Sequence, residues 1–309
     1  MSSQVDFVVA LAWPETYCKQ ASAWYDPLMR WIGFNRQGYY QVGHAAVVLV
    51  DGETGECSYF DFGRYHSPFG YGRVRSVWTD PELKVLTRAD IQGGRLLNMH
   101  NLLTELSENP FCHGEGVLCA GCYAVSGVKS TQKRIKAMQE KGLWTYGPFA
   151  RRGTNCSRFV RHVLLSSVSS WRKRWLLRLP WMVTPSPMYL VRLGDFGDRL
   201  QTEGVVHVPK ECAWGEVLSE PNRPPDLPRT ARWLSGEGAG SWYCISQVGT
   251  GFHIVRYDCQ GREESRGIYV LDHTGFDASR AYELVCPSHY RSVSVRQENT
   301  LFCFSLQAF

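Results

Sequence analysis

The chain has 309 residues, enough for one large domain or two ordinary ones, and its apolar share of 44% is that of a soluble globular protein. No run approaches the roughly 20 apolar residues that span a bilayer, so we do not expect a transmembrane protein. The net charge of +5 is small, and the basic residues cluster only near 172–178, so we expect no DNA or RNA partner.

The first residues lack the basic segment that opens a signal peptide. The apolar run at 7–13 is short and leads into Pro14, which is more typical of a buried strand. We therefore expect a cytoplasmic protein.

Eleven cysteines are scattered along the chain without a repeated spacing, so most are predicted to be buried thiols rather than disulfides. Cys119 and Cys122 form a CxxC pair, but no second pair follows at zinc-finger spacing. A metal or redox role for this pair is the less favoured alternative. We expect no metal and no organic cofactor.

The N-terminal part combines strands and helices. Short apolar runs at 7–12, 45–50 and 57–62 predict strands, and the Gly-containing acidic loop at 51–56 predicts a hairpin over 43–63. Helical patterns follow at 96–108 and 130–141. The fold class is therefore α+β, with an antiparallel sheet and helices.

The composition changes after about residue 205, where a proline-punctuated stretch begins. Beyond it, six short runs predict successive strands at 242–248, 252–258, 267–271, 281–285, 292–297 and 301–306. We predict one domain at 1–204 and a smaller, mostly-β domain at 205–309.

A further helix is expected to begin near Cys156, because Phe159 and Val163 lie on an apolar face that starts only after the cysteine. Either Thr154 or Asn155 would cap it. A cysteine is a nucleophile only as a thiolate, and a place in the first helical turn lowers its pKa. Cys156 is thus our candidate nucleophile. The alternative is that Cys156 is simply a small residue buried in a helix.

A nucleophilic cysteine needs a base, and the base needs a polar group to orient it. His44 stands at the beginning of an apolar strand that offers a polar ring no other obvious role, so it is the candidate base. A hairpin centred between residues 53 and 54 places Asp61 diagonal to His44 on the same face. Asp61 is the candidate orienting group, with Tyr59 and His66 as substitutes if the register slips.

Unsatisfied backbone amides at the start of the helix, beside Asn155 and Ser157, are the predicted oxyanion or substrate-binding donors. Tyr146 is a candidate additional donor. Its alternative role is that of a packed aromatic residue at a turn.

These motifs resemble a known family. The features that carry the resemblance are Gly43-His44-Ala45 opening an apolar strand and, about a hundred residues later, Asn155-Cys156-Ser157-Arg158-Phe159-Val160. They look like the circularly permuted branch of the NlpC-type papain-like superfamily, which includes lecithin:retinol acyltransferase-like enzymes. The resemblance covers roughly residues 5–195 and leaves the β-rich third unexplained.

The resemblance implies a papain-like core in the first domain and a thiol acyl-enzyme intermediate formed on Cys156, with His44 as base and Asp61 as orienting group. We expect a cysteine hydrolase that cleaves a peptide-like amide. One alternative is an acyltransferase or deacylase acting on an acyl-lipid substrate. Another is a non-catalytic binding protein on the same core.

The segment 171–179 bears on the substrate, because its apolar positions share a helical face and four cations occupy the rest. A basic amphipathic helix with tryptophans is typical of peripheral contact with an anionic membrane. The favoured alternative is a surface helix that docks its apolar face on the core.

Overall fold

The computed structural model describes residues 5–20, 26–33, 35, 38–112, 114–179, 183–200, 220–236 and 239–307. Its contacts divide the chain into two compact units. The first comprises Met1–Phe62 and Leu83–Cys212, and the second comprises Gly63–Glu82 and Ala213–Phe309. The sequence-based boundaries place residues 63–82 in the N-terminal domain, whereas the contacts group them with the C-terminal unit.

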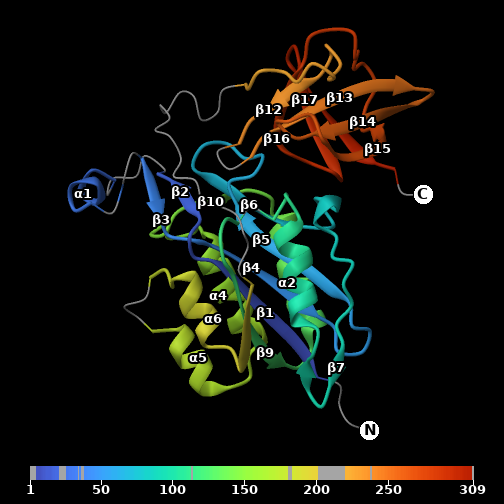
Figure 1. Ribbon diagram of the computed structural model, residues 1–309. Helices are drawn as coiled ribbons and strands as arrows, with labels where there is room; N and C mark the ends of the chain where they lie inside the picture. Colours follow the sequence, from blue (N-terminus) through green and yellow to red (C-terminus); the bar gives the residue numbers. More distant parts are fainter. Residues whose placement is uncertain are drawn as a thin grey trace. The chain divides into compact units, whose positions relative to one another are not determined.

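An antiparallel sheet organises the first unit (Figure 1). Its strands adjoin in the order β5-β4-β1-β9-β11. Their bounds are β1 Asp6–Trp13, β4 His44–Val50, β5 Cys57–Gly63, β9 Leu118–Val125 and β11 Phe196–Leu200. The central strand β1 is buried from Phe7 onward, which explains why it is a continuous apolar run rather than an alternating one.

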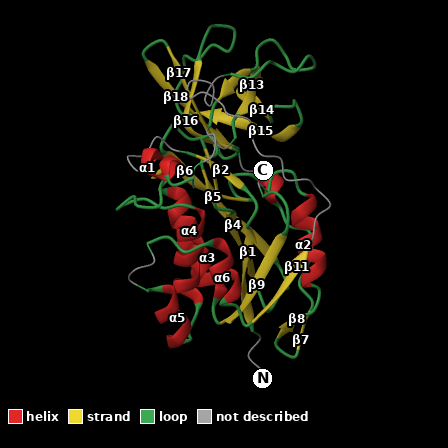
Figure 2. Ribbon diagram, turned by 60° about the vertical axis from the view of Figure 1, so that its left-hand side comes forward, coloured by secondary structure: helices red, strands yellow, loops and turns green. Residues whose placement is uncertain are grey.

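Helices cover both faces of this sheet. The helices of the first unit are α1 Asp26–Trp31, α2 Met99–Glu108, α3 Val128–Glu140, α4 Cys156–Ser167, α5 Trp171–Leu177 and α6 Pro187–Arg192. Figure 2 shows the sheet between α2 on one side and α3, α4 and α6 on the other. The apolar face of α2 packs on side chains of β1 and β4, and α4 contacts β4. The predicted α+β class is confirmed.

Shorter elements complete the first unit and its connections. They are β2 Tyr17–Lys19, β3 Tyr39–Gln41, β7 Ile91–Gln92, β8 Arg95–Leu96, β10 Trp144–Thr145 and the 3-10 turn η1 Pro81–Leu83. Within the described residues, no helix is long and apolar enough to cross a membrane.

The predicted hairpin is β4 and β5. Ala46 pairs with Asp61 and Val50 with Cys57, so the turn is centred between residues 53 and 54 and the predicted register is confirmed. His44 lies two residues before Ala46 and therefore on the same face of β4. His44 and Asp61 are therefore diagonal neighbours on one face of the sheet.

The second unit is mostly β, as predicted. Its C-terminal strands are β12 Arg232–Leu234, β13 Ser241–Val248, β14 Gly251–Tyr257, β15 Glu263–Leu271, β16 Glu283–His289, β17 Ser292–Gln297 and β18 Thr300–Leu306, and β6 Tyr71–Ser76 belongs to the same unit. The C-terminal strands adjoin in the order β12-β13-β14-β15-β18-β17-β16, and β12 also contacts β16, so the sheet curls on itself. Six of the seven C-terminal strands were predicted from sequence; the three-residue β12 was not.

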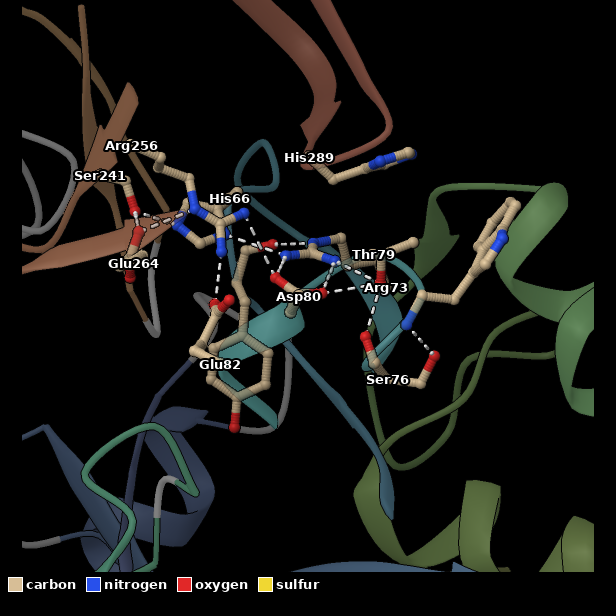
Figure 3. Close-up of polar contacts among 12 residues, drawn as sticks. His66, Arg73, Ser76, Thr79, Asp80, Glu82, Ser241, Arg256, Glu264 and His289 are labelled. Atoms are coloured by element: carbon tan, nitrogen blue, oxygen red, sulfur yellow. Dashed lines mark hydrogen bonds and ion pairs between the residues drawn. The ribbon is translucent and has the colours of Figure 1, made fainter. Parts of the chain in front are cut away.

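Buried charges hold residues 63–82 in the second unit (Figure 3). Arg73 donates hydrogen bonds of 2.7 and 2.6 Å to the two carboxylate oxygens of Asp80. Arg256 on β14 lies 3.4 Å from the same carboxylate, 2.8 Å from Glu264, and also pairs with Glu82. Buried ion pairs are costly to break by removing one partner, so this cluster fixes the segment firmly.

Candidate active site

The predicted nucleophile is the first residue of α4. Asn155 is the N-cap: its backbone is extended, and its Oδ1 accepts a hydrogen bond of 2.9 Å from the Arg158 amide. Phe159 and Val163 bury the apolar face of the helix. The change from polar to apolar residues thus starts the helix at Cys156, as the sequence predicted, and Asn155 rather than Thr154 is the cap.

Gly153 allows the chain to approach β10 just before the nucleophile. The Thr154 amide donates to the Thr145 carbonyl at 3.0 Å, and a β-carbon on Gly153 would lie 2.1 Å from that same oxygen. Arg158 also holds the loop that precedes Cys156, because its Nη1 donates a hydrogen bond of 2.9 Å to the Ala150 carbonyl. The position of Cys156 therefore depends on a glycine and an arginine close by in sequence.

β4 positions His44 at its first residue. The preceding Gly43 has φ +73°, and a β-carbon there would lie 2.9 Å from the Trp13 carbonyl oxygen. Trp13 pairs directly with His44 across the strands, and the two rings are 5.8 Å apart. Both residues are buried, so the indole shields the imidazole from water.

Asp61 lies on the neighbouring strand and is fully buried. Its Oδ2 is 3.8 Å from Nε2 of His44, a distance suited to charge pairing but longer than a direct hydrogen bond. Tyr59, which the sequence offered as a substitute for Asp61, instead donates a hydrogen bond of 3.2 Å to that Oδ2. Tyr59 and Asp61 therefore share one face of β5, and the tyrosine contacts the carboxylate that lies beside His44.

His66, the second substitute, lies in the second unit. Its Nε2 is 2.6 Å from the Ser241 hydroxyl, and its Nδ1 is 3.0 Å from Nη2 of Arg73 (Figure 3). Burial, together with the charges of Arg256 and Arg73, holds the pKa of His66 well below its usual range. The ring is thus a neutral part of the buried cluster around Asp80.

The pKa of His44 is raised and that of Cys156 is lowered, so both side chains favour their charged forms. Burial lowers the pKa of His44, but the Asp61 carboxylate and the Cys156 sulfur outweigh this and raise it to about 9. Burial raises the pKa of Cys156, but His44, the Ala45 amide and the Ser157 hydroxyl outweigh this and bring it below its ordinary value. The pair therefore favours a thiolate beside an imidazolium.

A pocket of about 480 Å³ opens beside Cys156. Its lining includes the three residues predicted as oxyanion or substrate donors, Tyr146, Asn155 and Ser157. The Ser157 hydroxyl lies 4.0 Å from the Cys156 sulfur. The Tyr146 ring stacks on Phe62 with centroids 6.0 Å apart, so it is a packed aromatic residue as well as a pocket wall.

Other parts of the pocket wall were not predicted. Met29, Val42 and Phe149 give the wall its apolar character, and Pro185 and Pro187 extend it. The last two belong to a Thr-Pro-Ser-Pro stretch at 184–187. Its two prolines are a sequence signal for a rigid wall that ends in a helix start, and Pro187 is the first residue of α6. Trp13 was also missed, although its place at the end of a buried strand could have indicated it.

The CxxC pair lies on β9, where residues three apart point to opposite faces of the sheet. Burial raises the pKa of both thiols, that of Cys122 to about 12. Within the described ranges, no group of three or more His, Cys, Asp or Glu side chains is placed to hold a metal ion.

Comparison with known proteins places this site in a family. The family described as type VI secretion system effector TseH-like matches residues 8–173, more than half of the chain, and the one described as DUF6695 C-terminal domain matches residues 231–307. The crystal structure of the type VI secretion system effector TseH is similar, at 19% identity and a TM-score of 0.43, over 65% of this chain and 94% of that one. No curated protein matches. Because the first match spans more than half of the sequence, the chain belongs to the type VI secretion system effector TseH-like family.

Proposed function

We propose that this protein is a cysteine-dependent hydrolase that cleaves a peptide-like amide bond through a thiol acyl-enzyme. The observation that carries the proposal is the buried pairing of Cys156 with His44 at the wall of a pocket, with the pKa of each shifted toward its charged form. Such paired shifts at a concave site are typical of catalytic groups. Asp61 is the orienting group.

The reaction follows from these positions. The Cys156 thiolate attacks the substrate carbonyl carbon, and the amides of Cys156 and Ser157 face the developing oxyanion. These amides precede the first hydrogen bond of the helix, which Phe159 donates to the Asn155 carbonyl at 2.8 Å. His44 gives its proton to the leaving amine, then takes one from the water that hydrolyses the thioester.

A second candidate is deacylation of a membrane lipid or transfer of its acyl group. The apolar wall formed by Met29, Val42 and Phe149 favours this version, because an acyl chain gains free energy by leaving water there. The chemistry at Cys156 is the same in both versions. They differ in the group that flanks the carbonyl.

The family adds a biological setting. Its description names a type VI secretion system effector, and we infer the same role for this chain. A papain-like core is compatible with this role. Membership in the lecithin:retinol acyltransferase-like branch, and a cytoplasmic location, stay predictions.

Covalent trapping tests the proposal. The protein is incubated with activated amides and with activated esters of short and long acyl chains, and the acylated residue is located by mass spectrometry. We expect an adduct on Cys156 that slowly hydrolyses and that is absent from Cys156→Ala. Preference for long-chain esters over peptide-like amides would favour the lipid version.

Iodoacetamide labelling separates catalysis from binding. The Cys156 thiolate should react faster at neutral pH than the other ten cysteines, and His44→Ala should slow it. Equal labelling of all cysteines, unchanged in His44→Ala, would reject the catalytic reading and leave the binding protein.

A further inference from the structure

The helix α5 exposes its tryptophans instead of burying them. Trp171 is 76% exposed and Trp175 is 60% exposed, and their spacing of four residues places them on one side of the helix. Only Leu177 of this helix is buried. The favoured expectation, a helix that docks its apolar face on the core, is therefore wrong for the two indoles.

Polar contacts hold α5 in place while the indoles face outward. Lys173 pairs with Asp195 at 2.5 Å, and Nη1 of Arg174 donates to the carbonyls of Leu165 and Val168 at 2.7 and 3.1 Å. Two of the four cations of the segment are thus occupied in fixing the helix. The other two, Arg172 and Arg178, are exposed beside the tryptophans.

We propose that Trp171, Arg172, Trp175 and Arg178, the α5 face, dock the protein on an anionic membrane surface. The residues 171–179 contain no acidic side chain, and the nearby Asp195 is neutralised by Lys173. Guanidinium groups pair with lipid phosphates, and indoles favour the boundary between headgroups and acyl chains.

A lipid surface fits this face better than a protein does. A folded partner or a second copy would need a shaped pocket for each indole, whereas a fluid bilayer boundary accepts two indoles on a fixed helix without one. The charge complementarity with anionic headgroups points the same way. The docking is independent of the chemistry proposed for Cys156.

Co-sedimentation with vesicles tests this inference on the full chain. Vesicles of phosphatidylcholine alone are compared with vesicles that also contain phosphatidylglycerol. We expect binding to the second kind that weakens with added salt. Arg172→Glu with Arg178→Glu should lower the binding constant by about thirtyfold or more, since each cation near such a surface contributes several-fold. Trp171→Ala with Trp175→Ala should lower it comparably.

Matched variants make the test specific. Trp31→Ala removes a tryptophan that is 83% exposed on α1, and Arg95→Glu reverses an exposed cation of β8; both should bind like the unaltered protein. Cys156→Ala should also bind normally, which separates docking from catalysis.

An equal loss of vesicle binding in Trp31→Ala, equal binding to neutral vesicles, or no binding at low salt would overturn the proposal. Self-association that depends on Trp171 and Trp175, without vesicle binding, would assign the face to a second copy instead.

Discussion

Tyr59 and His44 meet the same oxygen atom of Asp61. The Tyr59 hydroxyl donates a hydrogen bond of 3.2 Å to Oδ2 of Asp61, and Nε2 of His44 lies 3.8 Å from that oxygen. Because all three side chains are buried, water does not screen the charge of the carboxylate. The tyrosine thus fixes the carboxylate that raises the pKa of His44.

Asp61→Asn is expected to reduce kcat/KM by roughly 10²- to 10⁴-fold, because general acid–base catalysis contributes about that much and depends here on the orientation of His44. Tyr59→Phe keeps the ring in the core and should cost far less, about tenfold or below, because the charge of Asp61 remains. Steady-state kinetics with the substrate found by trapping would measure both. An equal loss in the two variants would show that the Asp61 carboxylate acts on His44 only when the Tyr59 hydroxyl holds it in place.

The pH dependence of the reaction follows from the two pKa shifts. Because the pKa of Cys156 is lowered and that of His44 is raised to about 9, Cys156 should be alkylated faster at neutral pH than a cysteine with an ordinary pKa. Hydrolysis should fall as the pH rises through about 9, because His44 then loses the proton that the leaving group needs.

His44→Ala should move thiolate formation to higher pH, since burial, which raises the pKa of Cys156, is then no longer outweighed by the imidazolium. The alkylation rate of Cys156, followed by mass spectrometry across the pH range, measures this. If the pH profile of Cys156 alkylation were the same in His44→Ala, the imidazolium would not be the group that stabilises the thiolate.

The register that brings His44 to Asp61 was predictable because it depends on local features. The glycines at 52 and 55 and the acidic residues at 51, 53 and 56 mark one turn, and the pairing of β4 and β5 then follows by counting. The start of α4 was also predictable from neighbouring residues, since a capping asparagine precedes an apolar helical face. The strands of the second unit followed from their short apolar runs and the turns between them.

The remaining features depend on residues far apart in the chain. Met29 and Pro185 meet in one pocket wall, and no pattern in either segment indicates the other. Likewise Glu82 pairs with Arg256, 174 positions later, so the place of residues 63–82 in the second unit depends on polar contacts that hydrophobic patterns do not show. The part of the pocket wall that Met29 and Pro185 form, and the place of residues 63–82 in the second unit, were therefore beyond sequence reasoning.

Gly43→Ala should disturb the base more than an ordinary glycine substitution does. The backbone has φ +73°, and the new β-carbon would lie 2.9 Å from the Trp13 carbonyl oxygen, so both strain and overlap oppose it. We expect a loss of about 2–4 kcal/mol in the free energy of unfolding, together with loss of activity. Gly142→Ala, with φ +79° and no atom within 4 Å of the new β-carbon, is the matched control and should cost only about 1–2 kcal/mol. Urea titration measures both, and equal costs would show that the contact with Trp13 imposes no constraint.

Arg256→Met tests the buried cluster of the second unit. The change leaves Glu82 and Glu264 buried without their cation, which should cost about 3–5 kcal/mol near neutral pH. Arg266→Met is the control, because its pairing with Glu263 is exposed and screened by solvent, so its removal should leave the stability nearly unchanged. Hydrogen exchange of the amides of β13 and β14 in urea measures the loss within the second unit itself.

The cost of Arg256→Met should depend on pH in a definite direction. Burial raises the pKa of Glu82 from 4.5 to about 7, so this group favours the folded state most below 4.5 and loses that contribution as the pH rises through 7. Arg256 opposes the rise, so its removal raises the pKa of Glu82 further and extends the loss to higher pH. The variant should therefore be closer to the unaltered protein at about pH 5 than at about pH 8, and adding Glu82→Gln should recover part of the difference at about pH 8. A deficit that is the same at both pH values, with no recovery on adding Glu82→Gln, would mean that Arg256 stabilises the unit by packing rather than by its charge.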